Sequence, residues 1–539
     1  MDSNDTAIAS SSQPSRVSFA LKSYYLITAA VCGAIVMMIE ILGSRVVGPF
    51  FGVSLFVWTS LITVTLLALA LGYALGGHLA DRYHAARYLY MIIMLSALFC
   101  LLVPFIKVFV LKACMNLGLR GGAFVSALIL FGPTLFLLGC VSPYLVKLST
   151  HEWHRMGKTV GGLYAISTLG STLGSLFTGF WMVGFLGIDH SLYLIGLLLA
   201  ILAAGYFILF QRNWIPLTVL VLAAFIYPQA HPYHKQLADG TVLNKIDQVE
   251  NYYGSIKILE SVSESQHARY LLLDNMIQGG IDVQSGLSIF PYTYHMQFLS
   301  YAHNPQGKRC LGIGMGIGIV LKWLEQQGII CDVVDINPKM FEVAERYFNY
   351  VPKGKRYIED GRYFLEHNDN RYDYVMLDVF SGELTPAHLL SQEAMQAIRR
   401  KLNPGAILSI NLISRLEGVS GATASVIKTL QSVFDTVEVY PVFDIEHSDV
   451  RKKIGNIIVV AYQGSTQPIN YAAIADFQVH PFYRRKVAGL LGKKYQIVDF
   501  SHALLLSDDY NPIDYFDADA REQIRWEVLK GIDLDFLLL

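Results

Sequence analysis

Acidic residues recur at the ends of predicted strands in the second half of the chain. Asp335 ends one apolar run, Asp360 follows a short third run, and Asp378 ends the run Tyr372–Asp378. A single acid in such a place is often only a helix cap. Three acids beside one glycine turn are better explained by a shared ligand site, because the carboxyl ends of parallel strands meet at one edge of a sheet.

The glycine turn consists of Gly314, Gly316 and Gly318, between a predicted buried strand and a predicted helix at Val320–Gln327. Glycine lets the backbone approach a ligand more closely than any side chain would allow. Such a turn alone is weak support, since many matches are ordinary tight turns. Here Asp335 follows about 20 residues later, and this combination is typical of a site for the adenosine part of a cofactor, with the acid on the ribose hydroxyls.

The elements that position these residues alternate between strand and helix, which predicts a doubly wound, mostly parallel sheet. The predicted strands are Arg309–Ile313, Cys331–Asp335, Arg356–Ile358, Tyr372–Asp378, Ala406–Asn411, Thr436–Tyr440 and Asn456–Ala461. Before this sheet, Val249–Ser261 and Arg269–Asp274 predict a small β-hairpin module, and Tyr292–Ala302 predicts a helix.

The first 228 residues are largely apolar, and six segments have roughly the 20-residue length that crosses a bilayer. The predicted spans are Tyr24–Val47, Leu55–Gly77, Tyr88–Leu111, Phe124–Val146, Val160–Gly187 and Ser191–Phe210. A seventh run, Trp214–Tyr227, would rise roughly 21 Å against a hydrocarbon core of about 30 Å, so spanning and interfacial placement both stay open. The fifth span carries small residues that favour close helix packing; they are Ser167, Gly170, Ser171, Gly174, Ser175 and Gly179.

Lysines and arginines in the short loops predict a cytoplasmic amino terminus. With six complete spans the second half of the chain is also cytoplasmic, whereas a seventh would place it outside. Adenosyl cofactors are made in the cytoplasm, so we expect a multi-pass protein of the inner or plasma membrane with a cytoplasmic catalytic domain.

Composition excludes some classes of function. The formal net charge of −1 gives no reason to expect a nucleic-acid partner. The six cysteines lack paired disulfide or metal spacing, so we expect buried thiols and no metal site. The predicted organisation is a disordered tail at 1–22, a transmembrane domain at 23–228, a linker and small β module at 229–305, an adenosyl-cofactor domain at 306–465 and a C-terminal extension at 466–539.

At these residues the chain resembles the spermidine synthase (polyamine aminopropyltransferase) family, and most closely its bacterial branch fused behind membrane helices. The resemblance rests on the following residues: Tyr253-Gly254, Leu273-Asp274, Gln278, Tyr294-His295, Gly314, Gly316, Gly318, Asp335, Asp360-Gly361, Asp378-Val379-Phe380-Ser381-Gly382, Pro386, His388 and Asp508-Asp509-Tyr510-Asn511-Pro512. It implies an all-α transmembrane bundle followed by a Rossmann-like class I S-adenosylmethionine-type transferase domain.

The resemblance also implies roles for single residues. Asp378 would be the catalytic base, and Tyr294 would shape the pocket of the acceptor. Asp360 would receive the adenine amino group. The residues expected to bind the adenosyl cofactor are Gly314, Gly316, Gly318, Asp335, Asp360, Gly361, Gln278 and His295.

Three departures from the family concern the recognition of cationic amines. Ile317 stands where soluble members have an aspartate that contacts the donor's aminopropyl amine. Met296 replaces the acid after the Tyr-His pair, and Ser381 replaces the second aspartate of the catalytic loop. An ammonium group in a site of low dielectric needs a paired carboxylate. The adenosine-binding residues are therefore present while several amine-binding acids are missing.

Three hypotheses follow. The first is a membrane-anchored aminopropyltransferase that uses decarboxylated S-adenosylmethionine and a polyamine-like acceptor. The second is a methyltransferase that uses S-adenosylmethionine itself. The third is a membrane transporter or sensor whose adenosyl domain does not catalyse. All three expect a lipid bilayer as partner and leave a homodimer open, and the first two expect a small amine acceptor.

Overall fold

The computed structural model describes residues 19–52, 55–150, 156–225, 234–380, 385–417, 421–447, 449–466, 468–516 and 518–531. The chain divides into two compact units, which are described separately. The first comprises residues 1–47 and 55–229, and the second comprises residues 48–54 and 230–539.

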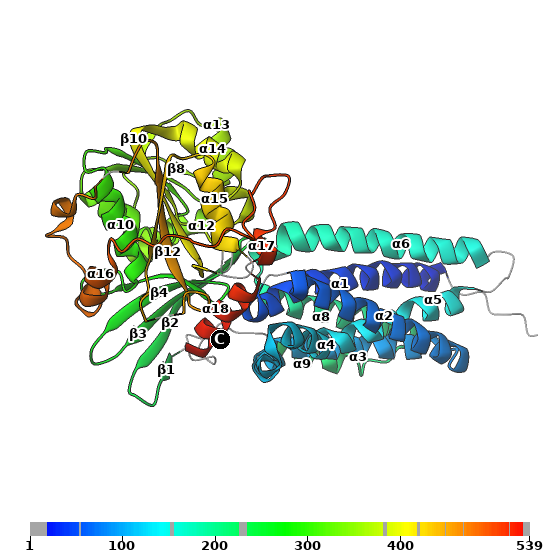
Figure 1. Ribbon diagram of the computed structural model, residues 1–539. Coiled ribbons are helices and arrows are strands. Elements are labelled where there is room, and N and C mark those ends of the chain that lie inside the picture. The colour runs from blue at the N-terminus through cyan, green and yellow to red at the C-terminus, as the bar shows by residue number, and fades with distance from the viewer. Residues whose placement is uncertain are drawn as a thin grey trace, which may run out of the picture. The chain divides into compact units, whose positions relative to one another are not determined.

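The described part of the first unit consists of helices and short connections (Figure 1). Its principal helices are α1 (Phe19–Phe51), α2 (Leu55–Arg82), α3 (Ala86–Cys114), α4 (Gly118–Gly139), α5 (Val141–Ser149), α6 (Met156–Phe177), α8 (Ile188–Gln211) and α9 (Leu217–Phe225). Among the described residues, five helical stretches are long and apolar enough to cross a membrane, and one of them, Ala86–Ser149, contains two predicted spans. Helix α9 has nine described residues, a rise of about 14 Å; Ile226 and Tyr227 lie outside the described residues.

Small residues bring α1 and α6 close together, as their pattern in the sequence predicts. A Cβ atom added at Gly170 would lie 2.1 Å from the Ala30 carbonyl oxygen, and one at Gly174 would lie 2.8 Å from Ala34 Cα. Ser171 Oγ donates a hydrogen bond of 2.9 Å to the Gly33 carbonyl. This close approach is the kind of packing that lipid-embedded helices use in place of hydrophobic burial.

Gly170→Ala should therefore destabilise the first unit by about 1–3 kcal/mol, because the new methyl group overpacks the contact with α1. Gly179 belongs to the same predicted set, yet a Cβ there would meet no atom within 4 Å. Thermal unfolding in detergent should show a lower midpoint for Gly170→Ala and little change for Gly179→Ala. Equal effects of the two substitutions would contradict this packing.

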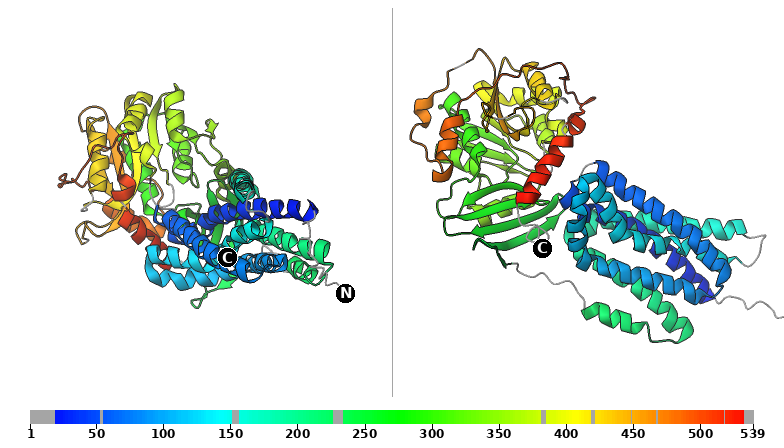
Figure 2. Two further views of the ribbon diagram at one scale, coloured as in Figure 1. Left: turned by 90° about the vertical axis from the view of Figure 1, so that its right-hand side faces the viewer. Right: turned by 60° about the horizontal axis from the view of Figure 1, so that its bottom comes forward.

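The second unit begins with an antiparallel sheet, drawn in green in Figure 2. Its five strands pair in chain order: β1 (His234–Gln236), β2 (Val242–Asn251), β3 (Gly254–Val262), β4 (His267–Leu273) and β5 (Met276–Asp282). The predicted hairpin module is therefore too small. Asp274 and Asn275 adopt φ of 47° and 64°, the backbone of a tight hairpin turn, and so return the chain into β5.

The cofactor domain contains a seven-stranded sheet in the order β11-β12-β10-β9-β6-β7-β8. Its strands are β6 (Arg309–Ile313), β7 (Ile330–Val334), β8 (Arg356–Tyr357), β9 (Tyr372–Leu377), β10 (Leu402–Arg415), β11 (Thr436–Pro441) and β12 (Ile454–Tyr462). β12 runs antiparallel to both β10 and β11, and the other four strand pairs are parallel, so the predicted mostly parallel sheet is confirmed. The strand order reverses between β6 and β9, the place where open sheets bind ligands.

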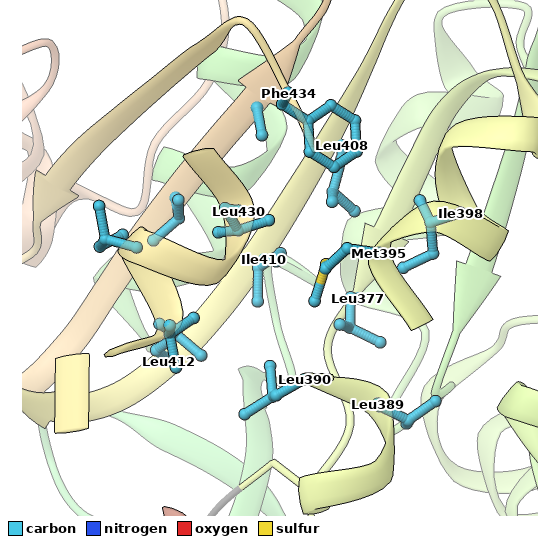
Figure 3. Packing of buried hydrophobic residues seen from close by; sticks show 14 of the residues in the cluster. Leu377, Leu389, Leu390, Met395, Ile398, Leu408, Ile410, Leu412, Leu430 and Phe434 are labelled. Atoms are coloured by element: carbon cyan, nitrogen blue, oxygen red, sulfur yellow. The ribbon is translucent and has the colours of Figure 1, made fainter. Parts of the chain in front are cut away.

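Helices cover both faces of this sheet. They are α10 (Pro291–His303), α11 (Ile319–Gln326) and α12 (Pro338–Phe348) on one face, and α13 (Gly361–His367), α14 (Gln392–Lys401) and α15 (Ala422–Gln431) on the other. Figure 3 shows the second face, where Met395 and Ile398 of α14 pack with Leu377, Leu408 and Ile410 of the strands. Burial of these apolar side chains holds the layers together and so fixes the carboxyl ends of β6, β7 and β9 side by side.

The C-terminal extension packs on the cofactor domain. Its helices are α16 (Arg484–Leu490), α17 (Ile513–Phe516) and α18 (Ala518–Gly531). Val487 of α16 and Ile474 join a buried cluster with Tyr294 and Phe298 of α10. The extension is therefore part of the folded unit rather than an appended tail.

Candidate cofactor site at the glycine turn

The glycine turn joins β6 to α11, and its glycines at 314, 316 and 318 have φ of 85°, 52° and 70°, a region that side chains disfavour. A Cβ atom at Gly314 would lie 2.4 Å from the Asp378 carbonyl oxygen, and one at Gly318 would lie 1.9 Å from the Tyr350 ring. At Gly316 it would meet no atom within 4 Å. The first and third glycines thus serve internal packing, whereas the second borders the open side of the turn.

This difference gives a prediction. Gly318→Ala should lower the free energy of unfolding by about 1–2 kcal/mol through backbone strain. It should lower it by about 1–3 kcal/mol more, because the new methyl group would overlap the buried Tyr350 ring. Gly316→Ala should cost only the backbone strain. It should nevertheless weaken the binding of an adenosyl ligand, because its methyl group would occupy the open side of the turn, where the ligand is expected to lie. Chemical denaturation and ligand calorimetry on the two variants would check this. A larger loss of stability at Gly316 than at Gly318 would refute it.

Asp335 follows β7 and is tied to the glycine turn. Its Oδ2 accepts a hydrogen bond of 2.9 Å from Met315 N, and its Oδ1 accepts one of 2.8 Å from Asn337 N. Burial raises the pKa of Asp335 to about 6, although the two backbone hydrogen bonds oppose this rise. The carboxylate is therefore tied to the backbone of the turn, and each of its oxygens keeps a further lone pair.

Asp360 caps α13, as a lone acid at a strand end often does. Its Oδ1 accepts hydrogen bonds from Arg362 N at 2.8 Å and Tyr363 N at 3.1 Å. Its Oδ2 lies 3.1 Å from His388 Nε2. A Cβ atom at Gly361 would lie 2.7 Å from Ile313 at the end of β6, so the Asp360-Gly361 pair sits beside the glycine turn.

Asp378 follows β9 on the other side of the turn. Its backbone N donates to the Ile313 carbonyl at 3.1 Å, and its Oδ1 accepts a hydrogen bond of 2.9 Å from Asn411 Nδ2. Asn411 is fully buried, and its own Oδ1 accepts from Asn456 Nδ2 at 3.0 Å. Burial raises the pKa of Asp378 to about 6 against the opposing hydrogen bond from Asn411. Asp378 is therefore an oriented carboxyl group whose pKa lies well above that of an ordinary aspartate.

The two residues of the Tyr-His pair are more deeply buried. The Tyr294 hydroxyl donates to the Ser288 carbonyl at 2.7 Å and accepts from His480 N at 3.2 Å, so it is already engaged within the fold. His295 Nδ1 lies 3.0 Å from the Pro291 carbonyl oxygen, while Nε2 has no hydrogen-bond partner among the described residues. Burial lowers the pKa of His295 to about 4, so its imidazole is neutral.

The structure brings the glycine turn, Asp335, Asp360 and Asp378 to one edge of the sheet. Gln278 lies in β5, and the next residue, Gly279, faces the turn: a Cβ atom there would lie 3.1 Å from Ile317 Cγ1. The antiparallel sheet therefore closes over the glycine turn. The assigned roles of these residues stay predictions.

Sequence reasoning missed several residues at this edge. Asn411 ends a predicted strand in the same way as the three acids, so the same signal could have identified it. Tyr292 also lies near Asp378: burial, and then the Asp378 charge, raise the pKa of Tyr292 well above its ordinary value. Ile336 and Ile358 follow β7 and β8 and are 43% and 60% exposed.

The departures from the family pattern have structural counterparts. Ile317 is 4% exposed and belongs to an apolar cluster with Ile256, Leu271 and Met340. Met296 is fully buried in the core of the cofactor domain. Ser381 lies outside the described residues. At position 317 the fold thus has an apolar contact in place of a carboxylate.

Parts of the chain are similar in sequence to known proteins. Residues 289–443 match a family model described as the spermine/spermidine synthase domain. The chain is 31% identical over 140 residues to a polyamine aminopropyltransferase of Vibrio vulnificus, which covers 25% of this chain and 46% of that protein. It is 27% identical over 170 residues to an N-terminal histidine N-methyltransferase of Emericella nidulans, with coverage of 31% and 30%. Both relatives are transferases, and the chain spans less than half the length of each.

Among solved structures, the chain is similar to a probable spermidine synthase from Corynebacterium glutamicum. The TM-score is 0.37 at 18% sequence identity, and the alignment covers 47% of this chain and 97% of that one.

Proposed function

We propose that this chain, which carries a spermine/spermidine synthase domain over residues 289–443, is a membrane-anchored aminopropyltransferase. Its donor would be decarboxylated S-adenosylmethionine, and its acceptor would be a polyamine-type amine. The observation that supports this most strongly is the Asp378 carboxylate, which lies beside the glycine turn, is oriented by Asn411 and has a pKa of about 6. A general base is most effective when its pKa lies near the working pH.

The reaction is an in-line displacement. The acceptor nitrogen attacks the aminopropyl carbon bonded to sulfur, and the C–S bond breaks as its electron pair returns to the sulfonium. The sulfur leaves as a neutral thioether, and the proton released from the new ammonium group passes to Asp378. The glycine turn, Asp335 and Asp360 would hold the adenosine half, so that positioning supplies most of the rate enhancement.

A second candidate is the transfer of a methyl group from S-adenosylmethionine to an amine. The absence of a carboxylate at position 317 is compatible with it, because the family uses an acid there for the aminopropyl ammonium of the decarboxylated donor, and Ile317 is instead a buried apolar contact. The same adenosine-binding residues serve both donors. The two candidates differ in the group transferred and agree on Asp378 as the base.

Product analysis separates the candidates. Full-length protein in detergent would receive each donor separately with a panel of amines, and mass spectrometry would identify the alkylated product. The primary proposal expects an aminopropylated amine from decarboxylated S-adenosylmethionine. Methylated products alone would refute it in favour of the second candidate. If neither donor yields a product and the Asp378→Asn protein still supports its function in the cell, the hypothesis of a non-catalytic transporter or sensor replaces both transferase candidates.

We further propose that the apolar helices of the first unit anchor the enzyme in the inner or plasma membrane, with the catalytic domain in the cytoplasm. The support is the length and apolar character of five helical stretches and the placement of basic residues in the short loops. Protease treatment of sealed inverted and right-side-out vesicles tests the orientation. Cleavage of the cofactor domain only in right-side-out vesicles would overturn it.

A further inference from the structure

The C-terminal segment 503–513 lies across the helices that flank the cofactor site. Leu506 is fully buried; its N donates to Thr429 Oγ1 of α15 at 3.0 Å, and its carbonyl accepts from Gln392 N of α14 at 2.8 Å. This anchoring delivers the following residues, Asp508 to Pro512, to the neighbourhood of Asp360. The segment lies outside the matched domain at 289–443.

Asp508 holds the start of α13. Arg362 Nη2 donates to Asp508 Oδ2 at 2.9 Å, and the Arg362 side chain is only 19% exposed. The other oxygen, Oδ1, accepts from Ser391 Oγ, the residue that caps α14. Arg362 stands two residues after Asp360, so this ion pair fixes the first turn of the helix that Asp360 caps. Charge-assisted hydrogen bonds of this kind give geometric specificity as well as energy.

Asn511 supports the short helix that carries His388, the side chain that contacts Asp360. Its Nδ2 donates to the Ala387 carbonyl at 2.8 Å. Ala387 begins the short 3-10 helix η4 (Ala387–Leu389), which carries His388. His388 Nε2 in turn lies 3.1 Å from Asp360 Oδ2. Asp508 and Asn511, three residues apart, therefore secure both partners of the Asp360–His388 contact.

We infer that Asp508 and Asn511 are positioning residues that hold Asp360 and His388 in the arrangement that receives the adenine half of the donor. The inference rests on the proposed function and extends it to the C-terminal extension. Neither residue needs to touch the donor, because pre-organising the groups that do so lowers the cost of binding.

The test measures binding of 5′-methylthioadenosine, which carries adenosine and has neither an amino-acid nor an aminopropyl tail. Calorimetry on the full-length protein in detergent should show binding weakened about tenfold or more by Asp508→Asn and by Asn511→Ala. The KM for the donor should rise in parallel, while kcat at saturating donor and the KM for the acceptor should stay unchanged. Asp509→Asn removes the adjacent exposed carboxylate and should leave all four quantities unchanged.

Wild-type affinity for 5′-methylthioadenosine in folded Asp508→Asn would overturn the inference. Equal losses of donor and acceptor affinity, or a loss of folding in both variants, would also overturn it by showing a general structural role. If only Asn511→Ala fails to fold, the result for Asp508→Asn decides the test, because this substitution is isosteric and lies at an exposed residue. Failure of the unsubstituted protein to bind 5′-methylthioadenosine would overturn the proposed function, and this inference with it.

Discussion

Asp378→Asn should lower kcat by about 10²–10⁴-fold, the contribution of a positioned general base, and at the same time raise the free energy of unfolding at neutral pH. The second effect follows from the pKa of about 6, compared with 3.8 for an ordinary aspartate. Because the folded state binds this proton more tightly than the unfolded chain, the carboxyl group makes folding less favourable as the pH rises from about 4 to 6. Asparagine removes this penalty, which is about 3 kcal/mol for a pKa difference of about 2.

Asp373 provides a matched control in β9, the strand that Asp378 follows. It accepts hydrogen bonds from Lys308 N at 2.7 Å and from Asn403 Nδ2 at 2.8 Å. Burial raises the pKa of Asp373, but these hydrogen bonds outweigh burial, and its net pKa lies below the ordinary value. Asp373→Asn should therefore lower stability and spare kcat, the reverse of Asp378→Asn. Steady-state rates and denaturant unfolding of both variants would check the pair, and a stabilised, fully active Asp378→Asn would exclude the base.

The pH dependence of the wild-type reaction follows from the same group. Since only the ionised carboxylate accepts a proton, kcat/KM should fall as the pH drops through about 6. Asn411→Leu removes the hydrogen bond that lowers the pKa of Asp378, so its acidic limb should move to higher pH. A limb that stays in place in Asn411→Leu would show that another group controls it.

Ile317→Asp restores the family's acidic residue and should nevertheless destabilise the protein by about 3–5 kcal/mol, the cost of an uncompensated buried charge. Ile317 lies in an apolar cluster with Leu271 and Met340, and Gly279 leaves room for its side chain. We expect no gain in affinity for decarboxylated S-adenosylmethionine, because the introduced carboxylate would be protonated or would disrupt the contact. Denaturant unfolding and donor calorimetry measure the two effects.

Ile317→Val is the matched control for this substitution. It keeps the contact apolar and should cost only about 0.5–1.5 kcal/mol. If Ile317→Asp proved as stable as Ile317→Val and bound the decarboxylated donor more tightly, then position 317 would face the donor's tail and not the cluster.

Local patterns in the sequence were sufficient to predict the sheet and the centre of the site. Short apolar runs separated by helical patterns predicted all seven strands of the cofactor domain within a few residues. Buried parallel strands give this signal because they are continuous apolar segments. The glycines at 314, 316 and 318 predicted the turn, because few other residues adopt its positive φ. The acids at 335, 360 and 378 predicted the edge where the strands end. The extra strands of the antiparallel sheet were missed, in part because β1 and β2 are largely polar and have almost no buried positions to form an apolar run.

Only the tertiary structure decided which distant groups act on those residues. Asn411 reaches Asp378 because β10 lies next to β9, and Asp508 reaches Arg362 because the chain returns across α14 and α15. Ile317 is seen to be a buried contact only once β5 closes over the turn. These pairings depend on packing between segments up to 146 residues apart in the chain. The periodicity of a segment indicates which of its own residues are buried, but it does not indicate which other segment packs against them. The sequence by itself therefore determined the backbone of the site, and tertiary packing determined the surroundings of its side chains.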